Sequence, residues 1–220
     1  QEAQRLGMTS TRFVNPTGLP GKGQYTTARD MALLAATIRR EFPEYAGYFS
    51  LEGVTTGKKN YPNFNLLVGR FDGADGMKTG YTEAAGYCLI STARRTGPAG
   101  ERRLLSVVVG TSSTEARASE SQKLLNWGYS AFDVVKLFDG GQAVTQAPVW
   151  KGRSDTVGLG RTQPIVAVVP RGQASQVRTV VTRNDPLLAP LSKGQAVGRL
   201  QVTLNGQPWQ TLPLQSLDDV

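Results

Sequence analysis

From residue 142 onward, short runs of β-type residues recur at regular intervals, and this spacing limits what the C-terminal part of the chain can fold into. Segments rich in glycine, proline, asparagine and aspartate separate the runs, as is typical of strands joined by turns. The runs occupy residues 142–150, 165–169, 177–182, 196–204 and 208–212. Between the last two stands Asn205-Gly206, the strongest hairpin signal in the chain. The spacing predicts an all-β sandwich of about 80 residues, with its boundary near residue 137.

The preceding part mixes helical and strand patterns. Thr27 is a candidate N-cap, with Asp30 in the position of a capping box, and a 3.6-residue apolar period follows it up to Pro43. Two apolar segments, residues 87–93 and 104–110, are separated by turn residues and predict adjacent antiparallel strands. Residues 114–138 are spaced as a helix, either continuous or broken at Gly128. The predicted fold is therefore an α+β domain over residues 1–137, followed by an all-β domain over residues 138–220.

Charge and composition exclude several functions. The net charge of +8 comes from 25 basic residues spread along the 220-residue chain without an aromatic-interleaved basic run, which argues against nucleic-acid binding. Without histidine, the chain can form neither a histidine-dependent catalytic triad nor a histidine-ligated metal site. Its single cysteine provides neither an internal disulfide nor a zinc cluster. We therefore expect no cofactor or metal.

The segment most suggestive of function is residues 75–82, Asp-Gly-Met-Lys-Thr-Gly-Tyr-Thr, which an apolar run follows at residues 87–90. Glycines on either side of Lys78-Thr79 allow another chain to approach the backbone closely. A lysine ammonium fixed on a strand would hold positive potential for an anionic substrate, and the hydroxyl of Thr79 could donate to a carboxylate. The lack of a side chain at Gly80 would keep the approach open. This pattern predicts a peptide ligand with a carboxylate.

Lys78-Thr79-Gly80 resembles the third motif of the serine penicillin-recognising enzymes. Three longer stretches, residues 24–32, 75–89 and 120–128, closely resemble the low-molecular-mass penicillin-binding proteins, which are D-alanyl-D-alanine carboxypeptidases. The resemblance covers essentially the whole chain. It implies part of a transpeptidase domain of the penicillin-binding-protein and β-lactamase type, with an antiparallel sheet and helices, followed by an all-β sandwich domain.

The resemblance also implies a reaction. A serine activated by a lysine would attack the D-Ala-D-Ala carbonyl of a peptidoglycan stem peptide, release the terminal D-Ala and form an acyl-enzyme that water hydrolyses. β-Lactam antibiotics would acylate the same serine. Lys78, Thr79 and Gly80 would position the substrate carboxylate and stabilise charge. The substrate-binding residues would be Lys78, Thr79, Gly80, Tyr81, Thr82 and Arg117. Tyr81 stands where the family frequently has histidine, and a solvated helix-start arginine is an alternative interpretation of Arg117.

The nucleophile itself is missing, because the sequence contains neither Ser-x-x-Lys nor Ser-x-Asn. Tyr61-Pro62-Asn63 imitates the second of these, but we discount it because Pro62 stands in its middle and the family's motif lies earlier in the chain. The asparagine-rich segment ending at Leu67 resembles the family's lead-in to the Lys-Thr-Gly strand, and an asparagine-rich turn before a strand is an equally good interpretation. In the family both motifs precede the segment with which this sequence starts. We therefore expect the C-terminal part of a larger enzyme, inactive alone, whose partner is the N-terminal part of the same catalytic domain. Family members continue into a membrane-anchoring helix, which implies a periplasmic location at the outer face of the cytoplasmic membrane.

Two other hypotheses compete with the carboxypeptidase. In the first, the chain is a non-catalytic cell-wall binding or structural module in which Lys78-Thr79-Gly80 is a relic. In the second it is a relative of the β-lactamases, which is disfavoured because a C-terminal β domain is not part of that architecture.

Overall fold

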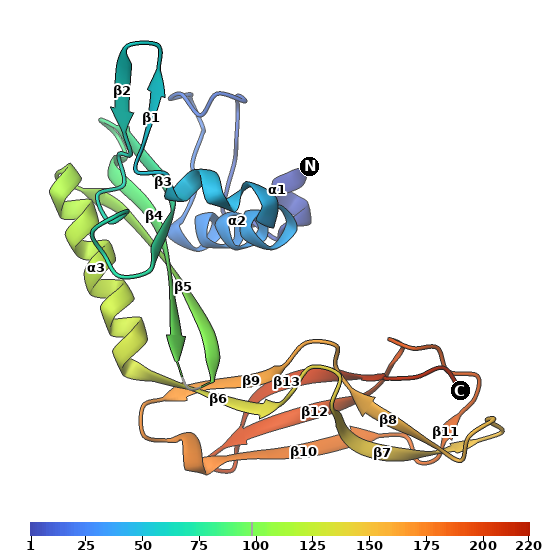
Figure 1. The fold of residues 1–220 in the computed structure, drawn as a ribbon. Helices are drawn as coiled ribbons and strands as arrows, with labels where there is room; N and C mark the ends of the chain where they lie inside the picture. Colours follow the sequence, from blue (N-terminus) through green and yellow to red (C-terminus); the bar gives the residue numbers. More distant parts are fainter. Residues whose placement is uncertain (98) are drawn as a thin grey trace. The chain divides into compact units, whose positions relative to one another are not determined.

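The computed structural model describes residues 1–97 and 99–220, and the chain divides into two compact units, Gln1–Tyr129 and Ser130–Val220 (Figure 1). The boundary expected from the sequence, after residue 137, lies within strand β6 (Phe132–Phe138). Where the chain divides into independently folding domains stays a prediction.

The first unit contains a three-stranded antiparallel sheet in the order β3-β4-β5, a separate β1-β2 hairpin and four helical elements. The elements are α1 (Glu2–Arg5), α2 (Ala28–Glu41), the 3-10 helix η1 (Pro43–Ser50), β1 (Gly53–Thr56), β2 (Lys59–Pro62), β3 (Ala74–Thr82), β4 (Gly86–Gly97), β5 (Gly100–Thr111) and α3 (Thr114–Ala131). The predicted antiparallel pair is confirmed as β4 and β5, and both strands extend beyond the apolar segments that indicated them.

Helix α2 begins as the sequence predicts, because the side chain of Thr27 accepts a hydrogen bond of 3.2 Å from the Asp30 backbone N–H. The Asp30 carboxylate is buried and serves a different purpose from a capping box. It accepts hydrogen bonds from the Ser10 backbone N–H at 2.9 Å and from Thr11 Oγ1 at 2.7 Å. Asp30 therefore ties the segment before α2 to the first turn of that helix.

Helix α3 packs on the sheet through an apolar cluster that contains Ala93, Ala118 and Leu125. Gly128 lies within the helix, where an added Cβ would come 2.7 Å from Leu104 Cδ1, so the absence of a side chain permits the close approach of helix and sheet. The prediction of a helix to residue 138 is wrong, because the chain changes to strand β6 after Ala131. Residues 132–138 are rich in aromatic and β-branched side chains and pair with β9 (Ile165–Pro170).

The second unit is built from strands, as the regular spacing predicts. Besides β6 and β9 it contains β7 (Ala143–Trp150), β8 (Thr156–Gly160), the 3-10 helix η2 (Ala174–Gln176), β10 (Val177–Arg183), β11 (Leu187–Leu188), β12 (Ala196–Leu204) and β13 (Gln207–Ser216). One sheet has the order β10-β12-β13-β8-β7-β11, and the other pairs β6 with β9. Asn205 and Gly206 adopt φ values of 53° and 75°, which suit the two-residue turn of the predicted β12-β13 hairpin. The fully buried core includes Leu159, Leu200 and Leu214.

Candidate functional site

The candidate motif lies on β3, at one side of the β3-β4-β5 sheet. Within residues 1–97 and 99–220, β4 is the only strand paired with β3. In this pair Lys78 lies opposite Ile90, Thr79 opposite Leu89 and Gly80 opposite Cys88. Because side chains alternate along a strand, Lys78 and Gly80 lie on one face of the sheet, and Thr79 and Tyr81 lie on the other.

The two faces have different surroundings. Gly76, on the face of Lys78, adjoins α2 and η1, because an added Cβ would lie 2.9 Å from Phe49 Cβ and 3.6 Å from Arg39 Nη2. On the face of Tyr81, the guanidinium of Arg117 from α3 lies 5.6 Å from the ring centroid of Tyr87. The motif thus presents its lysine on the α2 side of the sheet and its threonine on the α3 side.

The Lys78 side chain is exposed, and its ammonium donates a hydrogen bond to the carbonyl oxygen of Thr79. In the described part of the chain, no carboxylate lies within ion-pair distance of this ammonium. Its positive charge is therefore available to an anionic ligand.

Gly80 is open to its surroundings. A Cβ added to it would have no heavy atom of the described residues within 4 Å, and its φ does not lie in the left-handed region. By contrast, a Cβ added to Gly76 would collide with Phe49. The fold therefore requires glycine at position 76 and leaves free space at position 80.

The other predicted site residues of β3 differ in how exposed they are and in what they contact. The exposed Tyr81 ring packs against the ring of Tyr87, with centroids 4.4 Å apart and planes tilted by 37°. Thr79 is half-buried on the same face. The hydroxyl oxygen of Thr82 accepts a hydrogen bond of 3.0 Å from the Ala85 backbone N–H in the turn to β4. Tyr81 is thus exposed, and its contact with a ligand stays a prediction, whereas Thr82 stabilises the turn.

Arg117 is only 5% exposed, so the alternative of a solvated helix-start arginine is wrong. Its Nη1 donates to the carbonyl oxygen of Gly80 and its Nη2 to that of Phe64, both at 3.2 Å. Arg117 is also one of the residues that line a cavity of about 420 Å³. Arg117 therefore connects α3 to the backbone of the motif, and its direct contact with a substrate stays a prediction.

The asparagine-rich segment before β3 is structural. Asn63 Nδ2 donates to the carbonyl oxygens of Phe49 at 3.2 Å and Leu51 at 2.8 Å. Asn65 is buried, and its Nδ2 donates to the carbonyl oxygen of Gly76 at 2.7 Å. These contacts hold the β1-β2 hairpin and β3 in place, and they explain the asparagines without a catalytic role.

A charged network that no sequence pattern indicates lies beside the motif. The carboxylate of Asp75 contacts Arg39 Nη2 at 2.6 Å and Arg103 Nη1, and it accepts a hydrogen bond of 2.7 Å from Thr92 Oγ1. Burial alone would raise the pKa of Asp75, but the hydrogen bonds from Arg103 and Thr92 and the charge of Arg39 outweigh it, so the pKa lies below its ordinary value of 3.8. Burial lowers the pKa of Arg39, and the charge of Asp75 opposes that shift.

A metal centre is not evident in the described residues, since no three histidine, cysteine, aspartate or glutamate side chains are grouped there to hold an ion. The chemistry that this surface supports is the binding of an anion beside a strand.

Comparison with known proteins assigns both parts of the chain. Residues 1–113 match the family model described as D-alanyl-D-alanine carboxypeptidase, and residues 132–220 match penicillin-binding protein 5, C-terminal domain. The chain is 37% identical to the D-alanyl-D-alanine carboxypeptidase DacC of Escherichia coli over 99% of its length and 54% of that protein. It is 36% identical to DacA of Haemophilus influenzae, again over 99% of its own length and 55% of the relative. The chain thus spans about half the length of these relatives.

Solved structures agree with the sequence relatives. Penicillin-binding protein 5 from Haemophilus influenzae matches with a TM-score of 0.85 and 35% identity, over 99% of this chain and 63% of that chain. Penicillin-binding protein D2 from Listeria monocytogenes, in its ampicillin-bound form, matches 58% of this chain and 52% of its own with a TM-score of 0.52 and 37% identity. Because the first family model covers more than half of the residues, the chain belongs to the D-alanyl-D-alanine carboxypeptidase family.

Proposed function

We propose that this chain is the C-terminal part of a serine-type D-alanyl-D-alanine carboxypeptidase, which removes the terminal D-Ala from peptidoglycan stem peptides. The observation that carries the proposal is the exposed Lys78 ammonium beside the open position at Gly80, on a strand with one neighbour among the described residues. Family membership supports the reaction, and the lack of Ser-x-x-Lys and Ser-x-Asn supports a nucleophile outside these 220 residues.

In the proposed reaction, a serine deprotonated by its neighbouring lysine attacks the carbonyl carbon between the two D-Ala residues. The tetrahedral intermediate collapses when the amide nitrogen of the terminal D-Ala takes up a proton and leaves. Water then attacks the acyl-enzyme ester, which releases the shortened peptide and restores the serine hydroxyl.

Lys78, Thr79 and Gly80 act on the substrate rather than as the nucleophile. The Lys78 ammonium attracts the terminal carboxylate, and the open space at Gly80 lets the peptide approach the strand. An extended peptide aligned with β3 has Lys78 on one side and Thr79 and Tyr81 on the other. Thr82 stabilises the turn at the end of the strand by accepting a hydrogen bond from the Ala85 backbone N–H. Arg117 donates a hydrogen bond to the carbonyl oxygen of Gly80.

The proposed setting is the bacterial cell envelope, with the enzyme in the periplasm at the outer face of the cytoplasmic membrane. Its ligands there are the stem peptide ending in D-Ala-D-Ala and, as inhibitors, β-lactams. The ampicillin-bound form of the Listeria penicillin-binding protein supports the second of these. None of the helices in the described residues is both long and apolar enough to span a bilayer, and the proposed membrane contact is a C-terminal anchor outside this chain.

Labelled penicillin tests the proposal. The complete protein is expected to form a covalent adduct, whereas residues 1–220 alone are expected to form none and to release no D-Ala, because the nucleophile is lacking. An adduct on the 220-residue chain would contradict the proposed location of the serine. A complete protein that resists acylation would favour the non-catalytic wall-binding module.

Gly80→Ala is expected to slow penicillin acylation of the complete protein about tenfold, because a methyl group would occupy the space through which the ligand approaches. The melting temperature should stay near that of the wild type, since an alanine Cβ meets no described atom within 4 Å. Gly76→Ala is the matched comparison, and it should lower the melting temperature through its contact with Phe49. An unchanged acylation rate in Gly80→Ala would show that the ligand does not approach this position.

A further inference from the structure

Strand β3 contains an irregularity just before the motif. Ala74 pairs with Ala93 and Gly76 pairs with Thr92, so Asp75 is an extra residue in β3 without a partner of its own in β4. Such a β-bulge inverts the alternation of side chains beyond it. In a regular strand, residues 74 and 78 would share a face. Here Ala74 packs against the apolar cluster between α3 and the sheet, whereas Lys78 lies on the α2 side.

The bulge is held by side chains from three other elements. Arg39 of α2 donates through Nη2 to the Asp75 backbone oxygen at 2.8 Å and pairs with its carboxylate at 2.6 Å. Thr92 of β4 donates to the carboxylate and accepts a hydrogen bond of 2.9 Å from Arg39 Nη2. Arg103 of β5 contacts the other carboxylate oxygen. The Asp75 and Arg39 side chains are only 19% and 10% exposed, so water competes little for these contacts.

We propose that Asp75, through Arg39 and Thr92, is a positioning residue that fixes the bulge and thereby the face of β3 on which Lys78 is presented to an acidic ligand. This inference rests on the proposed function of Lys78. A one-residue slip in the pairing would move the lysine to the α3 face and place Thr79 on the α2 face. The contacts to both the backbone oxygen and the carboxylate of Asp75 oppose that slip, because the regular register has no bulge residue to receive them.

Asp75→Asn tests the inference, since asparagine keeps the shape of the side chain and removes the charge that pairs with both arginines. In the complete protein this variant is expected to slow penicillin acylation ten- to a hundredfold, as small misplacements of a substrate-binding group do. Asp72→Asn is the matched control, because the Asp72 carboxylate also pairs with an arginine, Arg95, at 3.0 Å but is 82% exposed and precedes β3. This control should acylate at the wild-type rate.

A double-mutant cycle separates positioning from general destabilisation. At a temperature below the melting temperature of all variants, adding Asp75→Asn to Lys78→Ala should not slow penicillin acylation further, because the lysine that Asp75 positions is already absent. Equal losses in both backgrounds would overturn the inference, and so would a wild-type rate for Asp75→Asn in a protein that Lys78→Ala impairs.

Amide hydrogen exchange provides a second measurement that does not depend on activity. Residues 76–82 should exchange faster in Asp75→Asn than in Asp72→Asn or the wild type, because a less securely held bulge opens more often. If Lys78→Ala acylates normally, the proposed function of Lys78 is wrong, and exchange alone decides whether Asp75 fixes the strand. Unchanged exchange in Asp75→Asn would overturn the positioning role.

Discussion

Replacing Lys78 with alanine in the complete protein is expected to slow acylation by penicillin ten- to a hundredfold. The change removes a charge-assisted contact with the ligand carboxylate, worth about 1.5–3 kcal/mol. It should leave stability nearly unchanged, because the side chain is exposed and its ammonium forms no ion pair within residues 1–97 and 99–220. Stopped-flow measurement of acylation by a labelled penicillin, together with a melting curve, gives both quantities.

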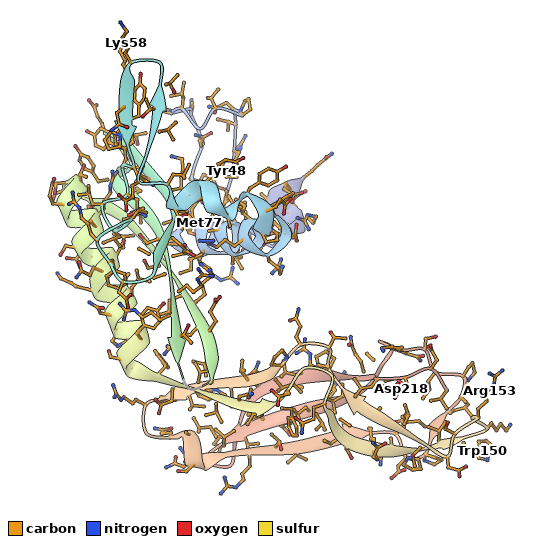
Figure 2. The ribbon with its side chains drawn as sticks, in the orientation of Figure 1. Tyr48, Lys58, Met77, Trp150, Arg153 and Asp218 are labelled. Carbon is orange, nitrogen blue, oxygen red and sulfur yellow. The ribbon has the colours of Figure 1, made fainter. Side chains whose placement is uncertain are left out.

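Three further variants sharpen this result. Lys78→Arg should also be slow, because a planar guanidinium does not replace a compact ammonium beside a strand. Thr79→Val should slow acylation less than Lys78→Ala does, since it removes a neutral hydrogen-bond donor and keeps the shape of the side chain. Lys58→Ala is the control, because Lys58 is an exposed lysine at the tip of the β1-β2 hairpin (Figure 2). If the activation free energy of acylation in Lys78→Ala lies within about 0.5 kcal/mol of the wild-type value, Lys78 is not part of the site.

Acid is expected to weaken the β3-β4-β5 sheet through Asp75. The pKa of this carboxyl is lower in the folded chain than its ordinary value of 3.8, so the unfolded state binds a proton more readily than the native state. The stabilisation from Asp75 is therefore complete above about pH 5 and is lost as the pH falls through 3.8 and then through the lower native pKa. The charges that face Asp75 are those of Arg39 and Arg103.

Asp75→Asn provides the measurement of this effect. At pH 7 it should lower the local free energy of unfolding by about 3 kcal/mol, because it leaves the largely buried Arg39 without its counter-charge. The difference from the wild type should shrink as the pH is lowered below 3.8, because Asp75 takes up a proton first in the unfolded wild type and then, at its lower pKa, in the native state. Hydrogen exchange in β4 and β5 reports this free energy without contributions from the second unit. A difference that is the same at pH 7 and pH 2.5 would show that the Asp75 charge does not stabilise the sheet.

The sequence was sufficient to predict the strands on which the candidate site depends. Alternating and apolar runs indicated β4 and β5, and Asn205-Gly206 indicated the hairpin of the second unit. Strand β8 was missed because its two glycines weaken the β-type pattern, although its backbone is closely packed and a Cβ on Gly160 would lie 2.4 Å from the carbonyl oxygen of Gln142. Strand β6 was assigned to a helix because its apolar residues continue the spacing of α3.

The candidate site was predictable only in part. Lys78, Thr79 and Gly80 are adjacent in the sequence, so a motif can indicate them. The face on which Lys78 lies depends on the bulge at Asp75, which is stabilised by Arg39, 36 residues earlier. The burial of Arg117 likewise depends on the carbonyls of Phe64 and Gly80. Contacts between residues so far apart in the sequence arise from the tertiary fold and leave no local pattern.

The central claim, that Lys78 recognises the terminal carboxylate of a D-Ala-D-Ala peptide, is tested most directly by varying the substrate and the residue together. D-Ala or D-alaninamide release would be measured with the complete protein from a peptide with a free terminal carboxylate and from the same peptide amidated at its end. The wild type should prefer the free carboxylate by ten- to a hundredfold in kcat/KM, and Lys78→Ala should lose that preference while keeping its rate on the amide. A Lys78→Ala variant that is slowed equally on both peptides, or that keeps the full preference, would contradict the claim.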